Sequence, residues 1–204
     1  MHERDIADLA RLHVACLDDS LVGVLGLGYV RSFYQYVAHS DKEFVVVERD
    51  QADRIVAAAV VSLEPATLNR RLLQQTPLFL NMVRRGHRML GLILWSAQRS
   101  RRASVPGPAY EASSRPELIL IFTSHEERGT GRGSALLRQV ESHLRARDVR
   151  EYEVRTVSDP ANPALSFYRE RAFTPAGISY RLGTCFQVFT RSLHDAPPSP
   201  PHST

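Results

Sequence analysis

A glycine-rich segment holds the residues of this sequence best suited to bind a phosphate group. Gly129, Gly131 and Gly133 alternate with other residues, and Arg128 and Arg132 supply two cations. Glycine lets the backbone turn where a side chain would clash, so successive N–H groups can converge on one anion. We therefore expect an anion-binding loop here.

The flanking residues predict that this loop joins a strand to a helix. Leu118–Phe122 is a short apolar run rich in β-forming residues. Leu136, Leu137, Val140 and Leu144 recur at helical spacing. The N-terminus of a helix offers unpaired N–H groups and the positive end of a dipole, which favour a pyrophosphate at this junction.

Two other phosphate-binding loops fit the sequence less well. A Walker A loop needs a lysine after its last glycine, and none follows here. A Rossmann loop needs a third glycine where Ser134 stands. In addition, Phe44–Val47 and Ile55–Val61 are joined by a short polar segment, which predicts an antiparallel hairpin. A turn that merely starts a helix remains the alternative.

The loop and a second segment together resemble a known family. Arg128-Gly-Thr-Gly-Arg-Gly133 resembles the Arg/Gln-x-x-Gly-x-Gly/Ala signature of the GNAT superfamily of N-acetyltransferases, whose loop holds the pyrophosphate of acetyl-coenzyme A. The expected strand Glu151–Val157 precedes Asn162-Pro-Ala-Leu-Ser-Phe-Tyr168, which resembles the family's Asn-x-x-Ala-x-x-Phe/Tyr-Tyr element. The resemblance covers residues 117–173.

This resemblance implies the fold. We expect an α/β protein of the mixed α+β kind, with a GNAT-like acyl-coenzyme A N-acyltransferase fold: a central twisted mixed sheet, helices on both faces and a helical insertion. Residues 1–194 would form one domain, with the insertion at about residues 66–108, and the proline-rich residues 195–204 would be disordered.

The remaining elements are expected from periodicity. Asp5–Leu17 predicts a first helix with Asp5 as its N-cap, and a second helix should begin near Tyr29. Leu68–Ser104 reads as helical with breaks near Pro77 and Gly86, and residues 178–193 as two short strands divided at Gly183.

The resemblance also implies a mechanism and site residues. The strands ending near Thr123 and Val157 would pair only at their start and hold pantetheine in the gap. Tyr168 is the candidate general acid, with a core aromatic as its alternative role. Glu117 is the candidate base, although a strand-edge glutamate is more often only solvated. The residues expected to contact acetyl-coenzyme A are Phe122, Thr123, Ser124, Arg128, Gly129, Thr130, Gly131, Arg132, Gly133, Ser134, Asn162, Ala164, Phe167 and Tyr168.

Some positions have competing roles or depart from the family. Asn162 is also a good helix N-cap, with Pro163 at the first helical position. His125 is expected on the loop surface. Ala172 stands where the family usually has glycine, and the long spacing from Val157 to Asn162 predicts a bulge. The usual first strand is nearly absent.

Composition sets outer limits on the function. The 204 residues carry a net charge of +4 and a pI of about 9.4. Cys16 and Cys185 match no zinc or disulfide spacing, so we expect reduced thiols and no metal. The arginines at 84–102 suggest nucleic-acid binding as a function, but no nucleic-acid-binding motif accompanies them. We prefer a face that is solvated or that touches a membrane surface. The apolar run Met89–Trp95 is too short to span a membrane, and we expect a cytoplasmic protein without stable membrane insertion.

The sequence thus predicts an acetyl-coenzyme A-dependent N-acetyltransferase, monomeric or homodimeric, that acts on a primary amine of a small molecule. An amino sugar and an amino-acid-like metabolite are the candidate acceptors. The alternative is a non-catalytic domain that binds acetyl-coenzyme A as a sensor or contacts a partner.

Overall fold

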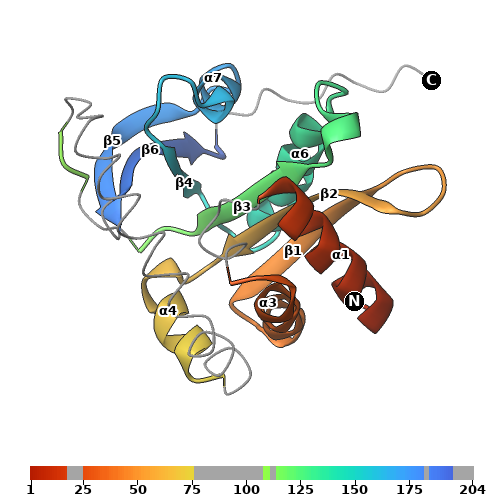
Figure 1. The fold of residues 1–204 in the computed structure, drawn as a ribbon. Coiled ribbons are helices and arrows are strands. Elements are labelled where there is room, and N and C mark those ends of the chain that lie inside the picture. Colours follow the sequence, from red (N-terminus) through yellow and green to blue (C-terminus); the bar gives the residue numbers. More distant parts are fainter. Residues whose placement is uncertain (18–24, 76–107, 111–113, 182–183, 195–204) are drawn as a thin grey trace, which may run out of the picture.

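A six-stranded mixed sheet forms the centre of the protein (Figure 1). The computed structural model describes residues 1–17, 25–75, 108–110, 114–181 and 184–194. All neighbouring strands pair antiparallel except β3 and β4, which are parallel. The strands are β1 Glu43–Arg49, β2 Ile55–Ser62, β3 Glu117–Thr123, β4 Glu151–Val157, β5 Thr174–Arg181 and β6 Thr184–Ser192, in the order β1-β2-β3-β4-β6-β5. The predicted mixed sheet and the β1–β2 hairpin are confirmed.

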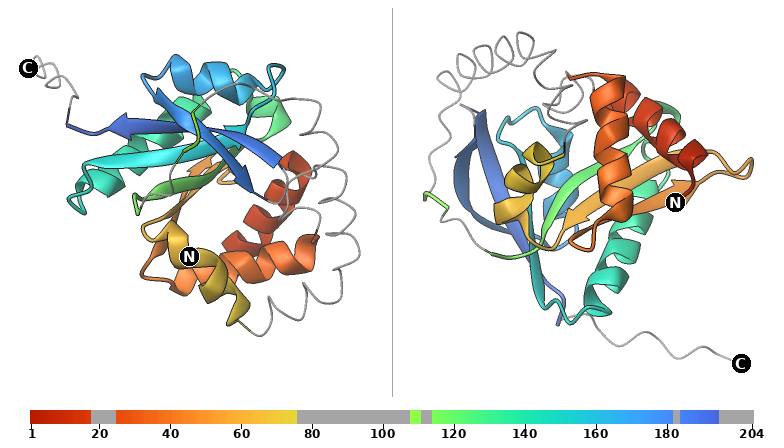
Figure 2. Two further views of the ribbon diagram at one scale, coloured as in Figure 1. Left: turned by 90° about the vertical axis from the view of Figure 1, so that its left-hand side faces the viewer. Right: turned by 90° about the horizontal axis from the view of Figure 1, so that it is seen from below.

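Helices cover both faces of the sheet (Figure 2). Apolar side chains of α1 (Glu3–Cys16) and α3 (Leu27–His39) pack on one face against β2 and β3. Those of α6 (Arg132–Arg145) and α7 (Pro163–Arg169) pack on the other face. The layered arrangement predicted from the sequence is therefore confirmed.

The insertion is described at its two ends. At its start, α4 spans Pro65–Leu73. At its far end, Ala109 forms a parallel bridge to Ile178, and this extends the sheet beyond β5. The rest of the predicted helical stretch to Ser104, the arginine cluster and the proline-rich tail lie outside the described residues.

Two predicted boundaries were wrong. The N-cap of α1 is His2, and Asp5 lies inside the first turn, where its carboxylate accepts the His2 N–H at 3.2 Å. The fifth strand begins at Thr174, before the predicted Ile178, because an edge strand tolerates Pro175 and a bulge at that point. The second helix begins two residues before Tyr29, close to the predicted start.

None of the helices in the described part of the chain is both long and apolar enough to cross a membrane.

A buried carboxylate ties α3 and α4 to the first strand. Glu43 is 3% exposed. It accepts hydrogen bonds from Tyr36 Oη at 2.7 Å, from Ser62 Oγ at 2.8 Å, and from Ser40 and Arg71. Burial alone would raise the pKa of Glu43, but the hydrogen bonds outweigh it and the pKa lies below the ordinary value.

We expect Glu43→Gln to destabilise the protein at neutral pH by about 2–4 kcal/mol, because Arg71 loses a buried anionic partner. A lowered folded-state pKa adds stability above the unfolded value of about 4.3, and this stability is lost as the pH falls through the folded value. Urea unfolding of both proteins should therefore show a difference that shrinks below about pH 4.

The matched control for this variant is Glu64→Gln. Glu64 also faces Arg71, at 3.7 Å, but its side chain is 49% exposed, so the loss should stay under about 1 kcal/mol. A Glu43→Gln effect of equal size at neutral and acid pH would show that the charge of Glu43 does not stabilise the fold.

Directly after α7, a non-glycine residue adopts the left-handed backbone conformation. This residue is Ala172, with φ 57°. The N–H groups of Phe173 and Ala172 donate to the carbonyls of Tyr168 and Arg169, both at 3.2 Å. This pair of bonds is a Schellman motif with Ala172 at C′, where glycine is preferred. The rings of Tyr168 and Phe173 pack across the turn with centroids 5.2 Å apart.

Ala172→Gly is expected to stabilise the protein by about 0.5–1 kcal/mol. Glycine removes strain of roughly 1–2 kcal/mol from the folded state. It also increases the conformational entropy of the unfolded chain, and this offsets part of the gain. Thermal unfolding would measure the gain. Ala135→Gly inside α6 is the control, because the same exchange in a helix interior should cost about 1 kcal/mol. A loss in both variants would rule out strain at Ala172.

Candidate active site

The sheet opens in its middle. β3 and β4 pair only at Glu117 with Glu153 and at Leu118 with Val154. In the pairing of β3 with β2, the register shifts between Leu118 and Leu120, so Ile119 is an extra residue on β3. A bulge bends its strand, and this one comes directly after the last pair with β4. The predicted splay is thus confirmed, and the bulge explains it.

The backbone of β3 beyond the bulge is divided between two neighbours. The Ser124 N–H donates to the Val56 carbonyl of β2 at 2.8 Å. Because backbone groups alternate in direction along a strand, those of Phe122 also face β2, whereas those of Ile121 and Thr123 face the gap. Of the three residues predicted to offer backbone groups, Thr123 is therefore the best placed. Its carbonyl already accepts a weak contact from Cys16 Sγ at 3.5 Å.

The glycine loop stands at the mouth of this gap. Gly129 and Gly131 have φ 79° and 91°, and a Cβ built on either would meet no atom within 4 Å. Gly131 is the N-cap of α6. Among the described residues, the N–H groups of Gly129, Gly131, Arg132, Gly133 and Ser134 donate to no backbone carbonyl, whereas those of Arg128 and Thr130 make long bonds of 3.5 Å to His125 and Glu127.

The loop has groups that can bind an anion. Four successive N–H groups at the N-terminus of α6, those of residues 131–134, and the N–H of Gly129 are of this kind. In addition, the Ser124 hydroxyl is buried directly after β3 and has no hydrogen-bond partner among the residues that the structure describes. A buried hydroxyl without a partner is costly, and a bound polar group would remove that cost.

The two arginines of the loop differ. Arg132 contacts Glu127 at 3.2 Å and Glu48 at 3.6 Å, so it fastens the loop to β1. Arg128 is exposed and makes no ion pair with the described residues. Arg128 is thus the cation with the greater freedom to meet a phosphate. His125 is exposed in a short 3₁₀ turn, His125–Glu127, as expected for the loop surface.

The second motif is built around the start of α7. The Asn162 Oδ1 accepts the Ala164 N–H at 3.1 Å, which caps the helix. Its amide nitrogen donates to Thr156 Oγ1 at 2.9 Å and to the Val157 carbonyl at 2.8 Å. Both amide hydrogens are used inside the protein, so these contacts give Asn162 a structural role. The predicted bulge before it was wrong, because β4 pairs with β6 without interruption to Val157 and a turn takes up the extra residues.

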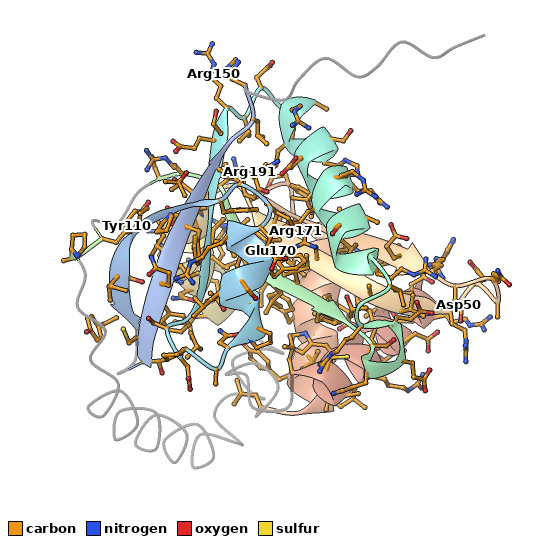
Figure 3. All side chains as sticks on the ribbon, turned by 90° about the horizontal axis from the view of Figure 1, so that it is seen from above. Asp50, Tyr110, Arg150, Glu170, Arg171 and Arg191 are labelled. Carbon is orange, nitrogen blue, oxygen red and sulfur yellow. The ribbon has the colours of Figure 1, made fainter. Side chains whose placement is uncertain are left out.

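Helix α7 packs against the glycine loop through one aromatic ring. A Cβ on Gly133 would lie 3.1 Å from the Phe167 ring, so this glycine permits the contact. Arg171 stacks on the same ring, 3.9 Å from its centroid, and donates to Ser134 Oγ at 2.9 Å. Figure 3 shows Arg171 between α7 and α6. The two predicted motifs are therefore in direct contact.

Tyr168 lies deep in the core of this half of the molecule. It is 3% exposed, and its ring packs against Phe167, Phe173 and Phe189. Burial raises the pKa of its phenol well above the usual value, so the group keeps its proton. No hydrogen-bond partner of the hydroxyl is found in the described part of the chain. The ring is a core aromatic, and the hydroxyl remains available to donate.

Glu117 is not a solvated edge residue. It is 4% exposed and pairs with Arg155 of β4 and with Arg181 of β5, the latter at 3.4 Å. Arg155 also bonds Glu153, which is fully buried and accepts a hydrogen bond from Tyr110. This acid–arginine cluster was missed in the sequence, where Glu151-Tyr-Glu-Val-Arg155 looks like an ordinary alternation of polar and apolar residues.

A hollow of about 330 Å³ lies elsewhere, beside the start of α7, and is lined in part by Asn162, Arg169 and Gln187. It shares only Asn162 with the predicted site. The gap between β3 and β4 and the glycine loop have the better chemistry for an elongated anionic ligand.

Solved structures share this fold at low sequence identity. An acetyltransferase is 15% identical, with a TM-score of 0.60 over 95% of this chain and 97% of the other. The ribosomal-protein-alanine N-acetyltransferase of Brucella melitensis is 14% identical, with a TM-score of 0.57 over 94% and 96%. An N-acetyltransferase from Staphylococcus aureus is 11% identical, with a TM-score of 0.56 over 95% of both chains.

Sequence comparison gives the family. No protein of curated function matched the chain. The model of the acetyltransferase (GNAT) family matches residues 2–173, which include strands β1 to β4, the glycine loop and α7. The chain therefore belongs to the GNAT family of acetyltransferases.

Proposed function

We propose that this protein transfers an acetyl group from acetyl-coenzyme A to a primary amine of a small molecule. The observation that supports the proposal is that the gap between β3 and β4 leads to the N–H groups of Gly129 and of residues 131–134, which donate to no backbone carbonyl of the described residues. An elongated ligand with a diphosphate at one end and amide groups along its length matches both parts. Acetyl-coenzyme A supplies an activated thioester at the far end of such a ligand.

The chain's own groups then have distinct tasks. The loop amides and Arg128 bind the diphosphate, and the backbone of Ile121 and Thr123 orients the arm. Glu117 takes a proton from the acceptor amine, directly or through water, before the neutral amine attacks the carbonyl carbon. Tyr168 donates its proton to the departing sulfur when the carbon–sulfur bond breaks. The second proton that the nitrogen loses returns to Tyr168, directly or through water, which leaves an amide, a free thiol and a neutral tyrosine.

Calorimetric titration with acetyl-coenzyme A is the first test. We expect saturable binding with one ligand per chain, and release of free thiol when a panel of primary amines is added. Tight binding with no turnover on any amine would favour a non-catalytic sensor. No binding would contradict the proposal itself.

A further inference from the structure

The face of the sheet opposite α6 carries charged groups that the proposed chemistry uses only in part. Along β4, Tyr152 and Val154 face the core under α6, so Glu153 and Arg155 face the other way. Glu117 is directly opposite Glu153 and shares this face. On β5, Ser179 and Arg181 lie on the same face, since Ser179 is opposite Phe186 and Phe186 is opposite Val157.

These groups converge because this half of the sheet is curved. The ion pair of Arg181 with Glu117 joins β5 to β3, which are three spacings apart in the order β3-β4-β6-β5. In a flat sheet three spacings are about 14 Å, too far for one side chain to cross. The bond from Tyr110 to Glu153 likewise reaches from beyond β5 to β4. The face is therefore concave. Figure 3 shows Tyr110 beside β5, at the end of the insertion.

The two cations that pair with Glu117 differ in burial. Glu117 and Glu153 are 4% and 0% exposed, and the Arg155 side chain, 7% exposed, is the deeply buried cation between them. Arg181 reaches Glu117 only from the rim, with 53% of its side chain exposed. Such an exposed pair is weak, so an ammonium group beside Glu117 can take the place of Arg181 at this carboxylate.

Two buried polar atoms on the same face have no hydrogen-bond partner in the part of the chain that the structure describes. Arg155 bonds Glu117 and Glu153 through its terminal nitrogens, but its buried Nε bonds none of the described residues. The same holds for the buried Ser179 hydroxyl. Both can donate, and unpaired buried donors indicate a missing acceptor. With Arg181 at the rim, they would suit a carboxylate.

We infer that this concave face is the acceptor site and that the acceptor is zwitterionic, an amino acid or a close analogue. Its amine lies beside Glu117 at the root of the gap, and its carboxylate is held by Arg181 together with Arg155 Nε or Ser179. This inference rests on the proposed acetyl transfer and adds the chemical class of the acceptor. Tyr110 closes the outer side, with its ring 5.8 Å from the Arg155 guanidinium.

The test compares amino acids with the amines that remain when their carboxylates are removed. L-Lysine and cadaverine form one pair, L-phenylalanine and phenethylamine another, with glucosamine as an amine that has no carboxylate. Dissociation constants are measured by NMR with the protein saturated with coenzyme A, so the readout does not depend on turnover. We expect at least one amino acid to bind about tenfold to hundredfold more tightly than its partner, the effect of one hydrogen bond between charged groups.

The variant Arg181→Gln should reduce that preference by a similar factor. Arg138→Gln, on the exposed side of α6, is the matched control and should keep the wild-type preference. Arg181 lies at the rim, so its replacement spares the buried core even where Arg155 variants fail to fold.

The outcomes separate the two proposals. If acetyl-coenzyme A does not bind, acetyl transfer is contradicted and the acceptor site falls with it. If acetyl-coenzyme A binds but both members of every pair bind equally, or none binds at millimolar concentration, only the zwitterionic acceptor is overturned. An unchanged preference in Arg181→Gln, or a preference for glucosamine, overturns it as well.

Discussion

Gly131→Val should lower the affinity for acetyl-coenzyme A by at least about 100-fold, which corresponds to two hydrogen bonds to a charged group. Gly131 has φ 91° and caps α6. A β-branched residue is strained at that angle, so the backbone must rotate and the N–H groups of residues 131–134 turn away from a common centre. Calorimetric titration measures the loss directly.

Thr130→Val tests whether a valine in the same loop is harmful where the backbone already holds a β-branched residue. It introduces the same side chain one residue earlier, at a position without positive φ. The Thr130 hydroxyl donates to the Glu127 carbonyl at 2.7 Å, so a small loss is expected, under about tenfold. Equal affinities for Gly131→Val and the wild type would mean that the loop amides do not bind the ligand.

Tyr168→Phe should lower kcat by about 100-fold to 1,000-fold at unchanged affinity for acetyl-coenzyme A, because a proton donor to the leaving thiolate is removed. The ring stays packed against Phe167, Phe173 and Phe189. Since no described residue bonds the hydroxyl, its removal leaves no buried partner unpaired and should change stability by less than about 0.5 kcal/mol. Thiol release under saturating acceptor measures kcat.

Tyr152→Phe is the contrasting variant. Tyr152 is also buried, but its hydroxyl donates to Glu141 at 3.1 Å. Its loss should reduce stability by about 1–3 kcal/mol and leave kcat near the wild-type value. If Tyr168→Phe instead loses stability and keeps its kcat, Tyr168 is a core residue and another group protonates the sulfur.

Local signals in the sequence were sufficient for the parts of the site that lie on one segment. The strand before the glycines, the loop and the start of α7 at Asn162-Pro163 each carry their own propensities, so their positions followed directly. The start of the first helix was predicted too late. An aspartate carboxylate can accept a backbone N–H either as the N-cap or at N3, and Asp5 is at N3.

The acid–arginine cluster could not be predicted because its members are far apart in the sequence. Tyr110 and Glu153, or Glu117 and Arg181, meet only after the sheet has curved and the end of the insertion has joined β5. Buried charges also oppose the usual expectation that the polar residues of an alternating strand face solvent. Nothing in the local pattern of Glu153 or Arg155 indicates burial.

The bulge at Ile119 gives β3 and β4 an unusual status. By position they are the two central strands, yet beyond Leu118 and Val154 each has the open hydrogen-bonding side of an edge strand. Exposed edges of that kind readily accept a further extended chain. A ligand that carries its own amides can therefore act as a substitute strand. One additional residue, Ile119, thus turns the most protected part of a sheet into a binding site.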